Sequence, residues 1–309
     1  MRIAIAVLVI SLTGLSVLAQ GPPTLRIVTE VPNLPSELFY GDIRVKPLRL
    51  RPGTNTPITI NDADFFVFQQ YVDFLSRMPD QSGFTFWVNE ITSCGGNAAC
   101  VDRQRVNSSG AFFLSTEFNG TGYFVYRLHK GSFGDLPRYT TFMPDTRQVA
   151  SGVIVGQGDW QGLLAANQTA FANAWVDRPA FLARYPTTLA AARYVDDLIQ
   201  TAGLTPAQAV SRDAIISEIA TAGYPLATAR AIGLRRVIES SAFDTKEKSP
   251  AFVLMQYFGY LRRNPNDAPD NNLEGYNFWL DKLNRFNGDF HAAEMVKSFI
   301  VSPEYLGRF

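Results

Sequence analysis

Residues 66–79 read FVFQQYVDFLSRMP, and residues 252–265 read FVLMQYFGYLRRNP. The two stretches align without a gap and share Phe, Val, Gln, Tyr, Leu, Arg and Pro, seven of fourteen positions. In both, apolar residues recur three and four apart, which predicts a helix that is buried on most sides. Gln69, Asp73 and Arg77 follow each other at four-residue spacing, so we expect them to form a narrow polar stripe.

The similarity continues beyond the two helices. Gly83–Trp87 matches Gly275–Trp279 after an insertion of six residues in the later copy, and Ser115–Phe118 matches Ser302–Tyr305. Self-similarity at matched positions along a chain is the signature of a duplicated structural unit.

A weaker middle copy begins near Tyr194–Leu198 and ends at Ser240–Phe243. We therefore expect an all-α fold made of three related helical units, at about residues 61–118, 188–243 and 248–309. Units of this kind bury their apolar faces by stacking, so the expected body is elongated or bundled.

The segment Arg77–Trp87 resembles the R-x-P-D-x-x-G-x-x-[FY]-W signature of the bacterial "domain of unknown function 4214" family, which is similar to the helical linker domains of phycobilisomes. The resemblance covers about residues 61–309 and is strongest in the two outer copies. In the later copy Asn266 stands in place of Asp80, so a role that requires this aspartate is not expected there. The resemblance implies a helical, exported, often surface-associated module and implies no reaction.

The residues of this signature allow a binding site or a purely structural corner. Arg77 would lie in the last helical turn, at the negative end of the helix dipole. Pro79 would stop the helix, and Asp80 would cap the next one before Gly83. Trp87 would fold back over the corner. The same structural reading applies to the later copy, through Arg263, Pro265, Gly275 and Trp279.

The first nineteen residues have the composition of a signal peptide. Arg2 is followed by an apolar run, Ile3–Leu18, and Val17–Ala19 fits the small-residue cleavage rule, so the mature chain would begin at Gln20. We expect an exported protein, located in the periplasm, at the cell surface or outside the cell. No later stretch is long and apolar enough for a membrane span after signal cleavage.

Residues 20–60 form a proline-rich leader with a possible hairpin. Leu25–Val28 and Ile43–Lys46 alternate as short strands, with Tyr40–Asp42 as a turn. Helical periodicity begins at Asn61, and Gly131–Thr146, with its glycines and prolines, is expected to be a long connection.

The only cysteines, Cys94 and Cys100, enclose five residues that include Gly95 and Gly96. In an exported chain, a close and even pair of cysteines predicts a disulfide. A zinc site needs more ligands than this pair supplies, and the two histidines of the chain are remote in sequence.

The 28 Lys and Arg residues balance the 28 Asp and Glu residues. A balanced chain has no long-range field that attracts a polyanion, so we expect no nucleic-acid partner. No motif indicates a cofactor. The segment Gly156–Gly162 lacks the glycine spacing and the βαβ context of a dinucleotide loop.

One loop, residues 264–275, is rich in oxygen ligands. It lacks the glycine at position six and the glutamate at position twelve of a calcium-binding EF-hand loop, so a polar turn is favoured over a metal site. If the loop bound calcium, the ion would raise the melting temperature.

Catalytic chemistry is poorly supported. His129 and His291 accompany no nucleophile-elbow motif. The candidate carboxylate pairs are Asp62 with Asp64, Asp196 with Asp197, and Glu117 with Glu304. The first pair precedes a helix, the second points to different faces of one, and the third is expected to cap following helices. In the middle copy, Ala242 stands at the position that corresponds to Glu117 and Glu304. We expect no catalytic residue.

Repetition without catalytic groups favours a non-enzymatic exported or cell-surface module for interaction or assembly, whose partner is an envelope or extracellular protein or polysaccharide. The alternative is a carbohydrate-binding protein or glycoside-acting enzyme that uses a surface aromatic groove. This alternative predicts that one exposed groove contains the four tryptophans, Trp87, Trp160, Trp175 and Trp279.

Overall fold

The computed structural model describes the backbone of residues 25–28, 36–40 and 43–50, and then residues 54, 56–205, 208, 211–221 and 223–309. These residues fall into two compact units, one ending at Thr59 and one running from Ile60 to Phe309. The predicted signal peptide, residues 1–19, lies outside the described residues, as do Gly41 and Asp42 of the predicted turn.

The first unit contains the four strands β1 (Leu25–Val28), β2 (Ser36–Tyr40), β3 (Ile43–Leu50) and β4 (Pro57–Ile58). They pair antiparallel in chain order. Strands were expected at Leu25–Val28 and Ile43–Lys46, where the structure has them. β2, which begins directly after Pro35, was not predicted from the sequence.

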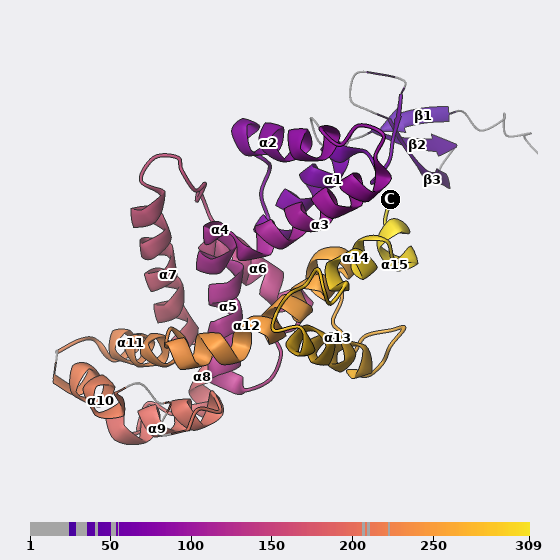
Figure 1. Ribbon diagram of the computed structural model, residues 1–309. Helices are drawn as coiled ribbons and strands as arrows, with labels where there is room; N and C mark the ends of the chain where they lie inside the picture. The colour runs from indigo at the N-terminus through magenta and orange to yellow at the C-terminus, as the bar shows by residue number, and fades with distance from the viewer. Residues whose placement is uncertain are drawn as a thin grey trace, which may run out of the picture. The chain divides into compact units, whose positions relative to one another are not determined.

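The second unit is helical, and the all-α class is confirmed. Its elements, coloured along the chain in Figure 1, are α1 (Ala63–Gln70), η1 (Tyr71–Leu75), α2 (Gln81–Thr92), α3 (Ala98–Leu114), α4 (Thr116–Gly120), α5 (Gly122–Phe133), α6 (Tyr139–Val149), α7 (Trp160–Val176), α8 (Pro179–Arg184), α9 (Ala191–Thr201), α10 (Arg212–Thr221), α11 (Leu226–Ile238), α12 (Ser241–Gln256), η2 (Tyr257–Leu261), α13 (Glu274–Arg285), α14 (Met295–Ile300) and α15 (Pro303–Leu306). Here η marks a π-helical turn. No helix among the described residues is long and apolar enough to cross a membrane.

Segments from the two outer copies lie against each other within this unit, far apart though they are in sequence (Figure 1). Phe113 of α3 stacks on Phe252 of α12 with ring centroids 4.2 Å apart. The π turns η1 and η2 also touch, and a Cβ on Gly259 would lie only 2.8 Å from Cζ of Phe74. Only glycine therefore lets the two turns approach this closely.

The predicted connection over Gly131–Thr146 is wrong in its second half, because α6 begins at Tyr139. The helix contains Pro144, which made the segment resemble a loop. Phe142, Thr146 and Val149 are nevertheless buried at helical spacing. Burial of one face therefore outweighs the local cost of the proline.

Both repeated helices end in the same unusual way. α1 passes into η1 and then into Ser76 at φ 56°, and α12 passes into η2 and then into Arg262 at φ 53°. Each regular helix thus ends before the proline, so the prediction that Pro79 stops the helix is wrong. A π turn followed by a left-handed residue already ends each helix, and the prolines lie in the turn beyond.

Two of the three residues of the predicted polar stripe are buried. Gln69 and Asp73 are almost fully buried, and Asp73 pairs with the other copy instead of with Arg77. Arg262 Nη2 donates to Asp73 Oδ1 at 2.9 Å. Arg308 Nη2 donates to both carboxylate oxygens at 3.0 and 3.1 Å. This ion-pair network around the buried Asp73 carboxylate joins the first helical segment to the chain end.

Candidate functional site

The sequence signature forms a compact corner around Arg77, which we call the first corner: Tyr71, Arg77, Asp80 and Glu117. Arg77 donates from Nε to Glu117 Oε1 at 2.5 Å and from Nη2 to Oε2 at 2.8 Å. Its Nη2 also lies 3.3 Å from Asp80 Oδ2, and its guanidinium carbon sits 5.0 Å from the centre of the Tyr71 ring. One arginine thus binds two carboxylates, with bidentate geometry on the first.

Asp80 caps α2, as the sequence predicts. Its Oδ1 accepts from Gly83 N at 2.8 Å and from Ser82 Oγ at 2.9 Å. Partial burial alone would raise the pKa of Asp80, but these hydrogen bonds and the Arg77 charge lower it below its usual value. Asp80 is therefore ionised at neutral pH and has no proton to give as a general acid.

Gly83 is required by packing rather than by backbone conformation. A Cβ at this position would collide with the hydroxyl of Tyr71. Burial, reinforced by the Asp80 charge, raises the pKa of Tyr71 to about 12, so the hydroxyl stays neutral.

Glu117 and Glu304 do not cap helices, which corrects the sequence prediction. Ser115 Oγ accepts from Phe118 N at 3.0 Å, and Ser302 Oγ accepts from Tyr305 N at 3.1 Å. The serines take the capping role because they stand one residue outside each helix. The glutamates, two residues later, are free to hold arginines.

The later copy repeats the arrangement as the second corner: Tyr257, Arg263, Asp270 and Glu304. Arg263 donates from Nε to Glu304 Oε1 at 2.5 Å and from Nη2 to Oε2 at 3.0 Å. Its guanidinium lies 5.4 Å from the Tyr257 ring centre. Asn266 stands in place of Asp80 here, but Asp270 supplies the second carboxylate and accepts from Arg263 Nη2 at 2.8 Å. The inserted loop therefore supplies a substitute for the lost aspartate.

The substitute restores the ion pair but not the helix cap. α13 begins after Leu273 without a side-chain cap, whereas Asp80 both caps α2 and contacts Arg77. Burial disfavours the Arg263 charge, yet the hydrogen bonds that Arg263 donates to Glu304 and Asp270 raise the pKa of Arg263 above its usual value. Both corners thus keep a charged arginine that is paired with two carboxylates.

A cavity of about 310 Å³ opens beside the first corner. Trp87 lines it together with Arg77, Asp80 and Glu117, so an aromatic ring and two carboxylates do meet in one place. Both carboxylates already bind Arg77, which keeps them from acting as a free acid and base pair. The cavity has the parts of a binding site without a poised catalytic pair.

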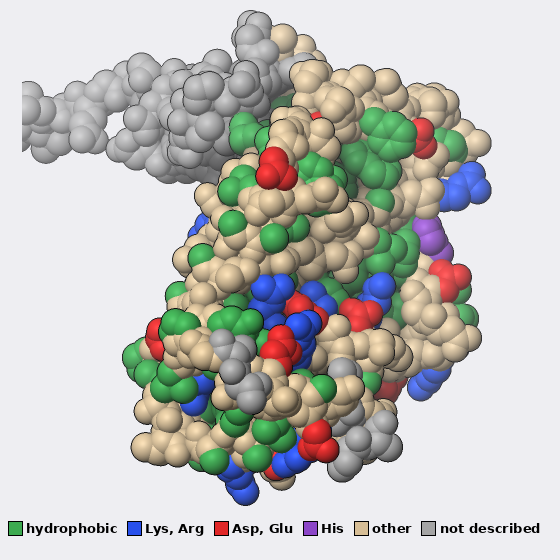
Figure 2. All heavy atoms as spheres, turned by 90° about the vertical axis from the view of Figure 1, so that its left-hand side faces the viewer, with side chains coloured by type: hydrophobic (Ala, Val, Ile, Leu, Met, Phe, Trp, Pro, Cys, Tyr) green, Lys and Arg blue, Asp and Glu red, His purple; other side chains and the backbone are tan. Residues whose placement is uncertain are grey.

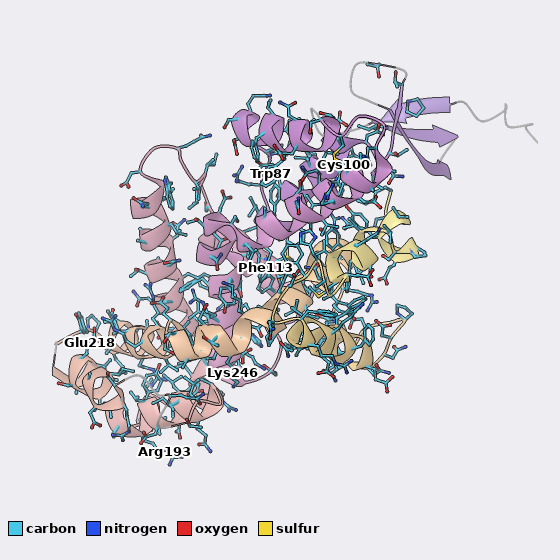
Figure 3. The ribbon with its side chains drawn as sticks, viewed as in Figure 1. Trp87, Cys100, Phe113, Arg193, Glu218 and Lys246 are labelled. Carbon is cyan, nitrogen blue, oxygen red and sulfur yellow. A yellow bond between two sulfur atoms is a disulfide. The ribbon has the colours of Figure 1, made fainter. Side chains whose placement is uncertain are left out.

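The four tryptophans do not gather in this cavity. Trp175 is buried and donates to Ser132 Oγ at 3.0 Å. Trp279 packs on Phe299, 5.8 Å between ring centres, and Trp160 starts α7. In Figure 3, Trp87 is labelled below α2. The aromatic groove of the alternative hypothesis is therefore reduced to one tryptophan at the first corner.

Cys94 and Cys100 form the predicted disulfide, with Cα atoms 5.5 Å apart. It closes the short link between the end of α2 and the start of α3, where Figure 3 labels Cys100. Asn97 caps α3 by accepting from Cys100 N at 3.1 Å. The bond therefore fixes the connection between the two helices that flank the first corner.

Within the described residues, no three His, Cys, Asp or Glu side chains form a group that could hold a metal ion. The oxygen-rich loop uses its carboxylates internally. Asp267 accepts from Asn264 N at 3.1 Å, and Asp270 binds Arg263. Such contacts order the loop and engage oxygens that a calcium ion would need.

Charges of opposite sign are interspersed over the face shown in Figure 2. Arg236 pairs with Glu218 at 2.8 Å, and Arg235 pairs with Glu239 at 2.8 Å.

Searches against known protein families and curated proteins find no match to this chain. The resemblance of the corner signature to a domain family thus stays a prediction.

Proposed function

We propose that this protein is an exported, non-enzymatic module for interaction or assembly, and that its outer copies present equivalent surfaces to an envelope or extracellular protein. The observation that carries the proposal is a pair of exposed phenylalanines at matched positions. Phe86 is 54% exposed and Phe278 is 57% exposed. Each ring lies edge-on to the tryptophan that follows it, at 4.9 and 5.0 Å and the same interplanar angle, 76°.

A second pair supports the same idea. Leu114 and Val301 precede the matched serine caps and are 47% and 48% exposed. Exposed large apolar residues that recur at matched positions are unlike the scattered single residues of an ordinary surface. A duplicated corner with the same exposed side chains therefore suits a module with two equivalent contact points.

The proposal includes export and the three-unit organisation. Export rests on the signal-like residues 1–19 and on the Cys94–Cys100 disulfide, a bond that persists in oxidising compartments. The middle copy has the serine cap, in which Phe243 N donates to Ser240 Oγ at 3.3 Å, but its described residues form no matching arginine corner. In this proposal it acts as a spacer between the two outer copies.

Affinity capture from intact envelopes tests the proposal. The wild-type protein should recover a defined partner, and the double variant Phe86→Ser with Phe278→Ser should lose it, while each single variant retains part of the signal. Leu226→Ser, also 54% exposed but located in the middle copy, serves as the control. Recovery of nothing above background, or of the same proteins by the double variant, would refute the proposal.

The cavity beside Trp87 favours carbohydrate binding as a second candidate, because an aromatic face beside polar groups suits a sugar ring. A glycan array and tryptophan fluorescence quenching would test it, with Trp87→Ala expected to abolish both signals. Trp279→Ala, at the matched position, is the control. Binding that survives Trp87→Ala would exclude this cavity as the sugar site.

A further inference from the structure

A second cavity, of about 400 Å³, lies where η1, η2 and α6 meet, and we call it the junction pocket. Its volume falls within the range of small-molecule sites. Valine, methionine and phenylalanine side chains form its apolar wall. Its polar lining is Asp73, Ser76, Arg77, Tyr139, Arg147 and Arg262.

The acidic groups at this pocket are already engaged. Asp73 accepts from both Arg262 and Arg308. Glu117 and Asp80 both bind Arg77. Counting Arg147 as well, four arginines accompany three carboxylates, which leaves one positive charge. That charge belongs to Arg147.

Several donors at the pocket have no partner among the described residues. Arg147 is exposed on α6 and makes no hydrogen bond or ion pair with them. Arg262 donates from Nε and Nη2 to Asp73, and its Nη1 has no hydrogen-bond partner among the described residues. Ser76 Oγ is buried and unpaired. A buried hydroxyl without a partner is costly unless something else satisfies it.

We infer that the junction pocket binds an organic oxyanion, a carboxylate, sulfate or phosphate group attached to an apolar body. The guanidinium groups of Arg147 and Arg262 supply charge-assisted hydrogen bonds, and Ser76 and the Tyr139 hydroxyl add neutral donors. Met78, Met143 and Phe258 would cover the apolar part of the ligand. This inference goes beyond the proposed function and depends on neither export nor a protein partner.

Isothermal titration of the purified protein with benzoate, phenyl sulfate and phenyl phosphate tests the inference, with benzyl alcohol as the neutral probe. At least one anion should bind at the junction pocket, and the neutral probe should bind at least tenfold more weakly. The strongest of the three anions identifies the chemical source. Arg147→Ala should weaken it by about tenfold, the effect of losing one charge-assisted hydrogen bond, and Arg147→Lys by less.

Arg285→Ala removes an exposed arginine from α13 and should leave binding unchanged. Because Arg147 makes no described hydrogen bond or ion pair, its variants should melt within a degree or two of the wild type. The inference is overturned if no anion binds, if benzyl alcohol binds as well as the anions, or if Arg147→Ala binds like the wild type.

Discussion

The two outer copies have the same residue types within their arginine corners and different residue types where the copies contact each other. In both corners the arginine guanidinium lies near a tyrosine ring and forms a bidentate ion pair with a glutamate. Position for position, however, Asp73 of the first copy corresponds to Gly259 of the last, and Ser76 corresponds to Arg262. These are the residues that join the copies, since Arg262 binds Asp73 and Gly259 admits Phe74. The residues of the corner recur in both segments, whereas the residues that differ between the segments make the contact between them.

The largest expected effect comes from breaking that interface at Asp73. Asp73→Ala leaves Arg262 and Arg308 without their buried carboxylate, so the free energy of unfolding should fall by about 3–5 kcal/mol. Urea unfolding measures it. Arg262→Ala should lower the free energy of unfolding by less than Arg308→Ala, because the Arg262 side chain is 47% exposed and that of Arg308 is 14% exposed. Equal losses from Asp73→Ala and from Asp281→Ala, an exposed position on α13, would contradict the interface.

The second prediction compares the corners directly. The Glu117 side chain is 5% exposed, whereas that of Glu304 is 37% exposed, although each forms the same bidentate pair. Water screens the second pair more strongly, so Glu117→Gln should cost about 2–3 kcal/mol and Glu304→Gln at most about 1 kcal/mol. Denaturant unfolding of both variants measures the ratio. If Glu304→Gln costs as much as Glu117→Gln, burial does not set the strength of these pairs.

The corners show which features a sequence reveals. The apolar spacing, the Asp80 cap and the Cys94–Cys100 bond involve residues close together in the chain, and the sequence predicts all three. The true partners of Asp73, Arg262 and Arg308, lie 189 and 235 residues away. Spacing along one helix instead suggested Arg77, because a helix periodicity carries no information about the neighbouring copy.

The later corner shows a second limit. Asp270 replaces Asp80 from within an insertion, so an ungapped comparison places Asn266 there and predicts a missing role. Glu117 was expected to cap a helix because its spacing fits, while the choice between capping and binding Arg77 depends on contacts 40 residues apart. The recurrence of Glu117 and Glu304 together with Arg77 and Arg263 was the signal available in the sequence.

The third prediction uses the disulfide, which braces the first corner alone. The link between α13 and α14 contains no cysteine. Replacing Cys94 and Cys100 together by serine should lower the free energy of unfolding by about 2 kcal/mol, since the bond closes a short loop. Thermal melts of the oxidised protein, the reduced protein and the double variant measure it. A reduced protein that melts like the oxidised one would show that the bond does not brace this corner.

The smallest expected effect separates the two roles of Asp80. Asp80→Ala removes the cap of α2 and one of the two carboxylates at Arg77, so at pH 7 it should cost about 1 kcal/mol. Since the folded pKa of Asp80 lies below its usual value, this contribution is present above the ordinary carboxyl pKa and is lost as pH falls through the folded value. Urea unfolding at pH 7, 5 and 3 should therefore show the difference between wild type and variant shrinking at the lowest pH. Asp270→Ala is the matched variant, because Asp270 contacts the arginine without capping a helix. A smaller loss from Asp270→Ala at pH 7 would assign most of the Asp80 effect to the cap, and an equal loss would assign it to the ion pair that both corners retain.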